Sequence, residues 1–282
     1  MIAIENLLTG NDWEQIALRT LLFLVLFEAV FRSIRSICKS NSIVGGLEKY
    51  KNMPRERLNE IWALKMTIGL HSLVVGPAAI YGIISDENML KVVRLLFKFD
   101  LDGLARSDLF YLHEDQICPL LTTFSVAFFL WDGCHGLCGT WESMDIPMVF
   151  HHAVSIVVWP IALHFRVCNL FLFSYQAMEL SSPFMQLRWY YLAFHGPTTK
   201  PYFYVSAVFA ITFTIVRVGM IPYHLTAYYV AKPWAAGGNA PHWLKMLATV
   251  TLPLPNLLNV FWFALIVTMA ARVLSPNKKK MK

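Results

Sequence analysis

Charged residues are scarce in this sequence. Asp, Glu, Lys and Arg make up 15% of its 282 residues, against about 25% in an ordinary soluble domain. This composition excludes an intrinsically disordered chain, which is poor in apolar residues, and a soluble enzyme, whose surface needs more charge at this length. Apolar and aromatic residues account for 56% of the chain, and the mean hydropathy is +0.49. The composition therefore predicts a polytopic membrane protein.

Cysteine is also too rare for a disulfide-stapled scaffold. There are five cysteines, an odd number, and most of them lie in or beside apolar runs. Cys134 and Cys138 flank His135, but no second Cys/His pair stands nearby, so we expect no metal site. The N-terminal region carries Glu5 and Asp12 and no early basic residue, so we expect no cleavable signal peptide.

The sequence contains many long apolar runs, and no internal repeat relates them. Seven runs are long enough to cross the ~30 Å hydrocarbon core of a bilayer. They lie at about 14–34, 61–84, 117–138, 146–164, 167–186, 202–224 and 247–274.

Basic residues are distributed unevenly between the connections. The connections 32–60 and 187–200, together with the tail after residue 271, carry 14 Lys and Arg, whereas the connections on the other side carry 7. Since the cytosolic side of a membrane protein is usually the more basic one, we expect a lumenal N-terminus and a cytosolic C-terminus. The net charge of +6 then reflects topology, and we expect no nucleic-acid partner.

The basic tail carries a possible sorting signal. Lys279 and Lys280 stand four and three places from the C-terminal residue of the sequence, counting that residue as one. They resemble the dilysine signal by which coat proteins return membrane proteins from the Golgi to the endoplasmic reticulum. The alternative interpretation is a basic cluster that anchors the last helix on anionic lipid, and both can hold together.

Ionisable residues inside a span are costly and are therefore candidate functional residues. Five of them converge on the expected cytosolic half of the bundle, namely Asp132, His135, His151, His152 and Glu179. His151 and His152 lie ~8–9 Å below the expected cytosolic boundary of their span. Glu179 lies ~10 Å deep if the fifth span ends near residue 186.

The two adjacent histidines point in directions ~100° apart on a helix. One can therefore enter a cavity while the other meets a neighbouring helix. An imidazole oriented by a carboxylate is typical of a general base or nucleophile. The alternative is a buried hydrogen-bonded pair that joins helices, and the spacing leaves both interpretations open.

Two later segments predict interrupted helices. The segment 181–183, Ser-Ser-Pro, follows Glu179 and should break the fifth span beside that carboxylate, because proline removes a helical hydrogen bond. Arg217 is followed by Gly219 and Pro222, which mark a kink or a helix end. A buried arginine needs an anionic partner, which we expect to be a lumenal acidic side chain or a lipid headgroup.

Five elements in this order resemble the TLC domain family, which includes the ceramide synthases and the translocon-associated TRAM proteins. They are Phe129–Asp132, Phe150–Ser155, Glu179–Phe184, Leu187–Trp189 and Arg217 with Pro222. The resemblance implies an all-α fold of about seven transmembrane helices, six of which form a barrel around a lipid tunnel open to the cytosol. It extends over residues 55–275, with residues 1–54 before this domain and a basic tail at 276–282.

The resemblance also implies roles for individual residues. His151, His152 and Glu179 are the candidate catalytic residues, and Asp132, His135, Ser182 and Arg217 are the candidate tunnel or gate residues. The ceramide synthases carry a His-Asp-x-x-Asp pattern where this chain has 178–182, Met-Glu-Leu-Ser-Ser. The form found here resembles more closely the non-synthase branch of the family, which is linked to membrane lipid composition.

Three functions are compatible with this resemblance. The first is a lipid-homeostasis protein of the endoplasmic reticulum membrane, which binds a lipid or an acyl chain in its tunnel and needs no cofactor. The second is a ceramide synthase that uses acyl-CoA as its acyl donor, with a histidine as base and Glu179 orienting it. The third is a non-enzymatic factor that carries cargo or lipid between the endoplasmic reticulum and the Golgi.

Overall fold

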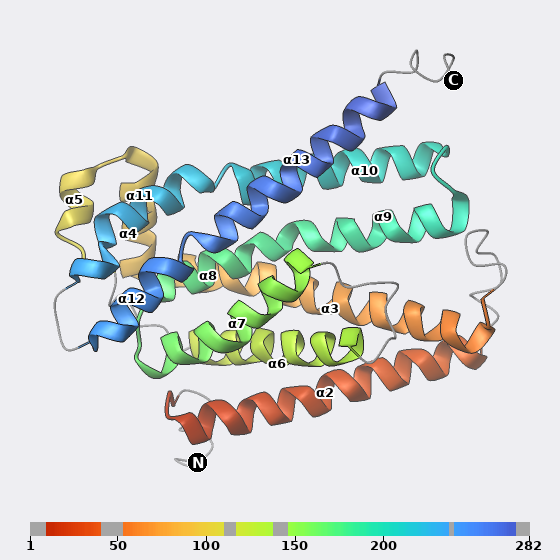
Figure 1. The fold of residues 1–282 in the computed structure, drawn as a ribbon, viewed down its shortest axis with the longest axis horizontal. Helices are drawn as coiled ribbons and strands as arrows, with labels where there is room; N and C mark the ends of the chain where they lie inside the picture. Colours follow the sequence, from red (N-terminus) through yellow and green to blue (C-terminus); the bar gives the residue numbers. More distant parts are fainter. Residues whose placement is uncertain (1–9, 41–52, 110–116, 138–145, 237–239, 275–282) are drawn as a thin grey trace.

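The structure, a computed structural model, describes residues 10–40, 53–109, 117–137, 146–236 and 240–274 (Figure 1). Every secondary-structure element in these ranges is a helix, so the predicted all-α class is confirmed. The elements are α2 (Trp13–Ser40), α3 (Arg55–Ser85), α4 (Glu87–Lys98), α5 (Leu101–Ala105), α6 (Ile117–Leu137), α7 (Ile146–His164), α8 (Asn169–Ala177), η3 (Met178–Ser181), α9 (Ser182–His195), α10 (Lys200–Phe213), η4 (Thr214–Val218), α11 (Ile221–Ala231), η5 (Pro233–Ala235), α12 (His242–Thr251) and α13 (Leu254–Leu274).

Four stretches of the described residues are long and apolar enough to cross a membrane. They are Arg55–Ser85, Ile146–His164, Lys200–Ala235 and His242–Ala271. The other three predicted spans lie on α2, on α6 and on the stretch from α8 to α9. The total of seven spans stays a prediction.

The outer faces of several long helices are apolar. Val25 of α2 is 69% exposed, Ile211 of α10 is 58% exposed and Leu257 of α13 is 63% exposed. A helix at the surface of a soluble protein turns polar side chains outward, and large exposed apolar patches mark contact with lipid or protein. These faces support the multi-pass membrane character.

Successive long helices run in alternate directions along the longest axis (Figure 1). One end of the molecule carries the start of α2, with α4, α5 and α12. The opposite end carries the end of α2, the start of α3, the turn between α9 and α10, and the end of α13. The described connections are therefore divided between two ends as the charge count requires. Which end faces the cytosol stays a prediction.

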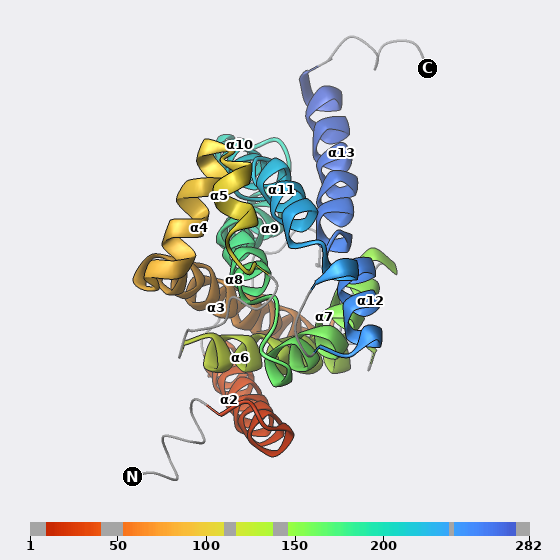
Figure 2. The same ribbon diagram turned by 90° about the vertical axis from the view of Figure 1, so that its left-hand side faces the viewer.

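Helix α2 lies outside the rest of the bundle and packs on α3 and α6 (Figure 2). The other long elements contact one another in the order α7, α6, α3, α8 with α9, α10 with η4, and α13, and α13 also contacts α7. This order brings residues from α6, α7, η3 and η4 close together in the interior. A closed barrel remains a proposal.

The predicted break in the fifth span is present. The residues Met178–Ser181 form a 3-10 turn, and α9 begins at Ser182 with Pro183 in its first turn. Gly76 of α3 faces this break, where a Cβ atom would lie 2.9 Å from the backbone nitrogen of Leu180. The lack of a side chain at Gly76 therefore lets α3 approach the broken segment closely.

The sixth span is interrupted as well. Thr214–Val218 form a single π-helical turn, which ends where the Gly219 N–H donates to the Thr214 carbonyl at 2.7 Å. A π turn inside an α-helix is rare and often occurs at a functional site. It sets the direction in which Arg217 leaves the helix.

The predicted depth of Glu179 was wrong. The fifth span continues beyond residue 186 to His195, so Glu179 lies ~24 Å from that end of the helix instead of ~10 Å. The additional turns contain Arg188, Trp189 and Tyr190, whose polar groups lower the hydropathy without ending the helix. Glu179 is consequently near the middle of the bundle.

Candidate functional site

A cavity of about 340 Å³ lies inside the bundle, lined by residues of α3, α6, α7, η3, α9, α10, η4 and α13. We refer to it as the main cavity. Most of its wall is apolar, with Ile68, Phe128, Phe213 and Trp262 among the lining residues. Six of the seven residues that the sequence predicted for catalysis or for the tunnel line it, and they are Asp132, His151, His152, Glu179, Ser182 and Arg217.

His152 is held on both sides of its ring. Its Nδ1 lies 2.9 Å from the backbone carbonyl oxygen of Met148, and its Nε2 lies 2.8 Å from Oδ2 of Asp132. A carbonyl oxygen accepts a hydrogen bond, so Nδ1 is the donor to Met148, and Nε2 forms the hydrogen bond with the carboxylate. Asp132 and His152 are 2% and 5% exposed. Both ring nitrogens of His152 are thus engaged, Nδ1 within α7 and Nε2 in joining α7 to α6.

His151 has a different environment. No hydrogen bond to its ring is formed by the residues that the structure describes, and its backbone carbonyl accepts from Ser155 Oγ at 3.0 Å. The ring packs edge-on against Phe129, at 5.2 Å between centroids, and against Trp262, at 6.0 Å. In the neutral imidazole, one nitrogen keeps a free lone pair. His151 therefore has the reactive nitrogen that His152 lacks.

Glu179 and Arg217 form an ion pair across the cavity wall, with Oε1 3.3 Å from the guanidinium Nη2. The second carboxylate oxygen of Glu179 accepts from Ser72 Oγ at 3.4 Å. The expected partner of Arg217, a lumenal acidic side chain or a lipid headgroup, is replaced by an acidic residue from the interior. Glu179 consequently does not orient a histidine, and Asp132 takes that place.

Three neutral side chains complete the surroundings of Arg217. Its guanidinium donates to Ser181 Oγ at 2.9 Å, to Ser182 Oγ at 3.1 Å and to Asn259 Oδ1 at 3.4 Å. Both serines come from the break in the fifth span, so the 3-10 turn and the π turn together build this network. A buried arginine that donates four hydrogen bonds in this way stabilises one arrangement of helices.

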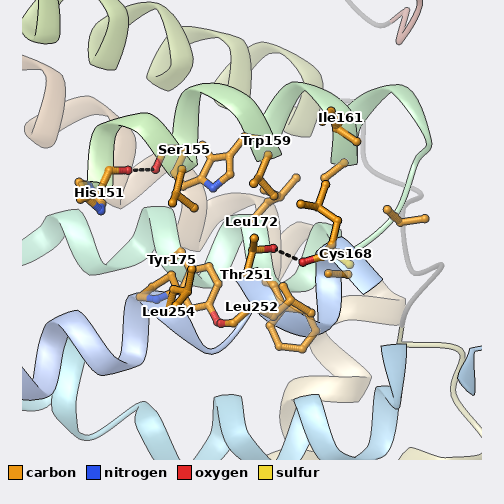
Figure 3. A pocket seen from close by; sticks show the side chains of 18 of the residues that line it. His151, Ser155, Trp159, Ile161, Cys168, Leu172, Tyr175, Thr251, Leu252 and Leu254 are labelled. Atoms are coloured by element: carbon orange, nitrogen blue, oxygen red, sulfur yellow. Dashed lines mark hydrogen bonds between the residues drawn. The ribbon is translucent and has the colours of Figure 1, made fainter. Parts of the chain in front are cut away.

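A second, smaller pocket of about 50 Å³ adjoins the main cavity (Figure 3). Its wall comes from α7, α8, α12 and α13 and is almost wholly apolar, and we refer to it as the apolar pocket. His151 lines both spaces. In Figure 3, His151 lies at one end of the apolar pocket, Trp159 and Leu172 lie along it, and Cys168 lies at the other end. An elongated apolar group fits this shape.

The remaining predicted site residues lie elsewhere. His135 is on α6 but faces α2, where its Nε2 is 3.2 Å from Oε2 of Glu28, and it lines a separate cavity between α2, α3 and α6. Lys279 and Lys280 of the predicted retrieval signal fall outside the described residues.

Sequence reasoning missed Ser72 and Asn259, which contact Glu179 and Arg217. Both are uncharged, and neither lies in one of the five sequence elements that resemble the TLC domain, whereas the uncharged Ser182 does. A polar amide such as Asn259 within the otherwise apolar α13 is a signal of an interior contact. Ser72 has no such signal, because a serine can bond its own helix, as Ser72 also does with the Ile68 carbonyl at 3.0 Å.

Comparison with known proteins adds two findings. A family model described as the TLC domain matches residues 62–268. The chain is also similar to TLC domain-containing protein 4-B of Danio rerio, with 22% identity over 234 residues, which cover 80% of this chain and 71% of the relative. The family match begins in α3 and ends in α13, so α2 lies outside it.

Proposed function

The chain belongs to the TLC domain family, and from this premise we propose that it is a lipid-homeostasis protein of the endoplasmic reticulum membrane, which holds a lipid or an acyl chain inside the bundle. The observation that carries the proposal is the main cavity of about 340 Å³, whose wall shares His151 with the apolar pocket. Ligand sites are typically concave and mostly apolar, with a few convergent polar groups.

The apolar pocket is suited to the chain of the ligand. Its wall offers almost no polar atom for a headgroup. Van der Waals contact with Val158 and Leu172 would stabilise an acyl chain bound there. The polar groups of the ligand then lie in the main cavity, near the two ion pairs.

His151 is the group we propose to act chemically in this site. Its free nitrogen borders both the headgroup region and the chain region, so a reacting carbonyl between them would lie against it. His152 and Asp132 hold α6 and α7 in place and are positioning residues in this proposal. Glu179 and Arg217 have the same role for η3 and η4.

The free imidazole also favours a second candidate function, acyl transfer from acyl-CoA to an amine. In that reaction the amine nitrogen bonds to the thioester carbonyl carbon and the carbon–sulfur bond breaks. His151 takes the proton from the amine and passes it to the leaving thiolate. The purified protein, given sphinganine and labelled acyl-CoA, would then form dihydroceramide. The absence of this product across several chain lengths, in a protein that still binds lipid, refutes this second function alone.

Lipid binding is tested with the purified full chain. We expect native mass spectrometry, or extraction and lipid analysis, to find lipid in a fixed ratio to protein. Val158→Phe should reduce that ratio at least several-fold, because the larger side chain fills a pocket of about 50 Å³. His195→Ala, at the exposed end of α9, is the control. A folded wild-type protein that retains no lipid refutes the proposal.

The carrier function depends on the tail and is tested there. Changing Lys279 and Lys280 to Ser should move the protein to the Golgi if these residues are read as a retrieval signal, without altering lipid binding. An unchanged location contradicts that role.

A further inference from the structure

The cation Arg188 remains without an anionic partner on the wall of the main cavity. Its Nη2 donates to the hydroxyl of Tyr202 at 2.8 Å, and its guanidinium carbon lies 5.3 Å from the centroid of the same ring. Among the residues that the structure describes, no carboxylate pairs with it. Arg188 is half-buried on α9, so its charge is partly removed from water.

The two carboxylates of this wall already have partners within it. Glu179 pairs with Arg217, and Asp132 Oδ2 lies 2.8 Å from Nε2 of His152. Lys65 also lines the cavity, and its ammonium lies 5.9 Å from the centroid of the Trp189 ring. A cation within a membrane-embedded cavity is costly unless an anion or dense hydrogen bonding accompanies it. The described part of the chain offers Arg188 one neutral hydroxyl, which leaves the other guanidinium hydrogens for a ligand.

The position of Arg188 places it at one end of the cavity. It lies seven residues before the end of α9, which corresponds to ~10 Å along the helix. That end of the molecule also carries the end of α2, the start of α3 and the end of α13 (Figure 1). His151 lines the same cavity and also lines the apolar pocket. An amphiphile in the cavity would therefore have its headgroup at Arg188 and its chain at His151.

A simpler interpretation is that Arg188 extends to the membrane surface, as arginines near helix ends do. The contact with Tyr202 argues against it, because one side chain both accepts a hydrogen bond from the guanidinium and holds its ring within 5.3 Å of the guanidinium carbon. That double contact holds the planar group against α10, with its other edge toward the cavity. Planar guanidinium groups bind phosphate oxygens in pairs.

We propose that Arg188 makes the main cavity selective for an amphiphile with a phosphate-bearing, anionic headgroup. This inference rests on the proposed lipid-binding function and adds the class of ligand. The phosphate has two possible sources, an anionic phospholipid from the bilayer and acyl-CoA from the aqueous side. A phospholipid carries its phosphate beside its acyl esters, and acyl-CoA carries its phosphates at the far end of the pantetheine arm. Both are amphiphiles with an anionic phosphate group, and Arg188 recognises that shared chemistry.

The test compares wild type, Arg188→Gln, Arg188→Lys and the control Arg94→Gln, which changes an exposed arginine of α4. Each protein is incubated in bilayers of phosphatidylcholine and phosphatidylglycerol in equal parts, and the lipids that stay bound after purification are quantified. In wild type and the control, the ratio of phosphatidylglycerol to phosphatidylcholine in the bound lipid should be about tenfold higher than in the bilayer, the size expected of one charge-assisted contact. Arg188→Gln should lose this enrichment and keep the total lipid per protein, and Arg188→Lys should keep part of it.

A second arm adds palmitoyl-CoA to the purified proteins. If its phosphates occupy the same place, it displaces bound phospholipid from wild type and the control at concentrations about tenfold lower than from Arg188→Gln. Dependence on Arg188 in either arm supports the inference and identifies the source. Two results together refute the inference and leave the proposed function standing. The first is bound lipid without headgroup preference, or with the same preference in wild type and Arg188→Gln. The second is displacement by palmitoyl-CoA that does not depend on Arg188. Absence of any bound lipid in wild type refutes the proposed function itself.

Discussion

The unequal surroundings of the two adjacent histidines make a sharp prediction for their removal. His152→Ala deletes the hydrogen-bond partner that lies 2.8 Å from Asp132. Asp132 is 2% exposed, and its other carboxylate oxygen already has no hydrogen-bond partner among the described residues. The variant therefore leaves a buried carboxylate with no partner in this part of the chain.

The magnitude follows from that loss. Breaking a buried ion pair by removing one member costs about 3–5 kcal/mol. Since about 1.4 kcal/mol changes an equilibrium constant tenfold, the unfolding equilibrium constant should rise by about two to three and a half powers of ten. His151→Ala should cost about 1 kcal/mol, since it removes ring contacts with Phe129 and Trp262 and no hydrogen bond to the described residues. Neighbouring positions in one helix thus differ by at least about 2 kcal/mol.

A double variant separates the ion pair from simple loss of packing. Replacing both Asp132 and His152 with Leu removes the two polar groups together and keeps apolar volume. Such replacements of buried pairs are often neutral or stabilising, so the double variant should be more stable than Asp132→Leu or His152→Leu alone. The interaction energy from this double-mutant cycle should exceed about 1 kcal/mol.

The assay is equilibrium unfolding in mixed micelles, with lipid content measured on the same preparations. His152→Ala should lose far more stability than His151→Ala, and His151→Ala should lose any acyl-transfer activity. His195→Ala provides the unperturbed reference. The reasoning is refuted if the two alanine variants are equally stable, or if the losses of the Asp132 and His152 single variants simply add in the double variant.

Three further predictions concern the breaks and the outer helix. Gly76→Ala should lower stability by about 1–3 kcal/mol and reduce bound lipid, because its Cβ would meet Leu180 at 2.9 Å; a wild-type melting curve would contradict the close approach. Glu179→Gln should destabilise the protein by about 2–4 kcal/mol, and Arg217→Met in the same chain should recover part of that loss in melting experiments; no recovery would indicate that the pair is unimportant. Glu28→Gln should cost about 1 kcal/mol of stability, since this half-exposed carboxylate accepts three hydrogen bonds. Lipid content should stay unchanged; a loss of lipid would connect the separate cavity between α2, α3 and α6 to the main cavity.

Much of the candidate site follows from the sequence. The histidine pair, Glu179, Ser182 and Arg217 are ionisable or polar residues within apolar runs, which makes each of them costly in a membrane and therefore noticeable. The proline at 183 also predicts a broken helix, because the loss of its N–H is a local property of the chain. Local chemistry of this kind can be predicted from the sequence without knowledge of the fold.

The pairing within the site was not predictable in the same way. The sequence favoured Glu179 as the partner of a histidine, but Asp132 has that place and Glu179 binds Arg217. Pairing depends on the rotation of each helix about its axis and on its depth in the bundle. The extension of α9 to His195 and the π turn at 214–218 change both, and neither is visible in hydropathy.

The sequence by itself determined the class of this protein, an all-helical membrane protein of the TLC domain family, because apolar run length and motif order are properties of the chain. It also determined that the two adjacent histidines must point in different directions, since the helix imposes that angle on any neighbours. Only the tertiary structure decided that His152 is bonded on both sides while His151 borders both cavities. That difference arises from which helices pack on each face of α7, and packing is a property of the whole fold.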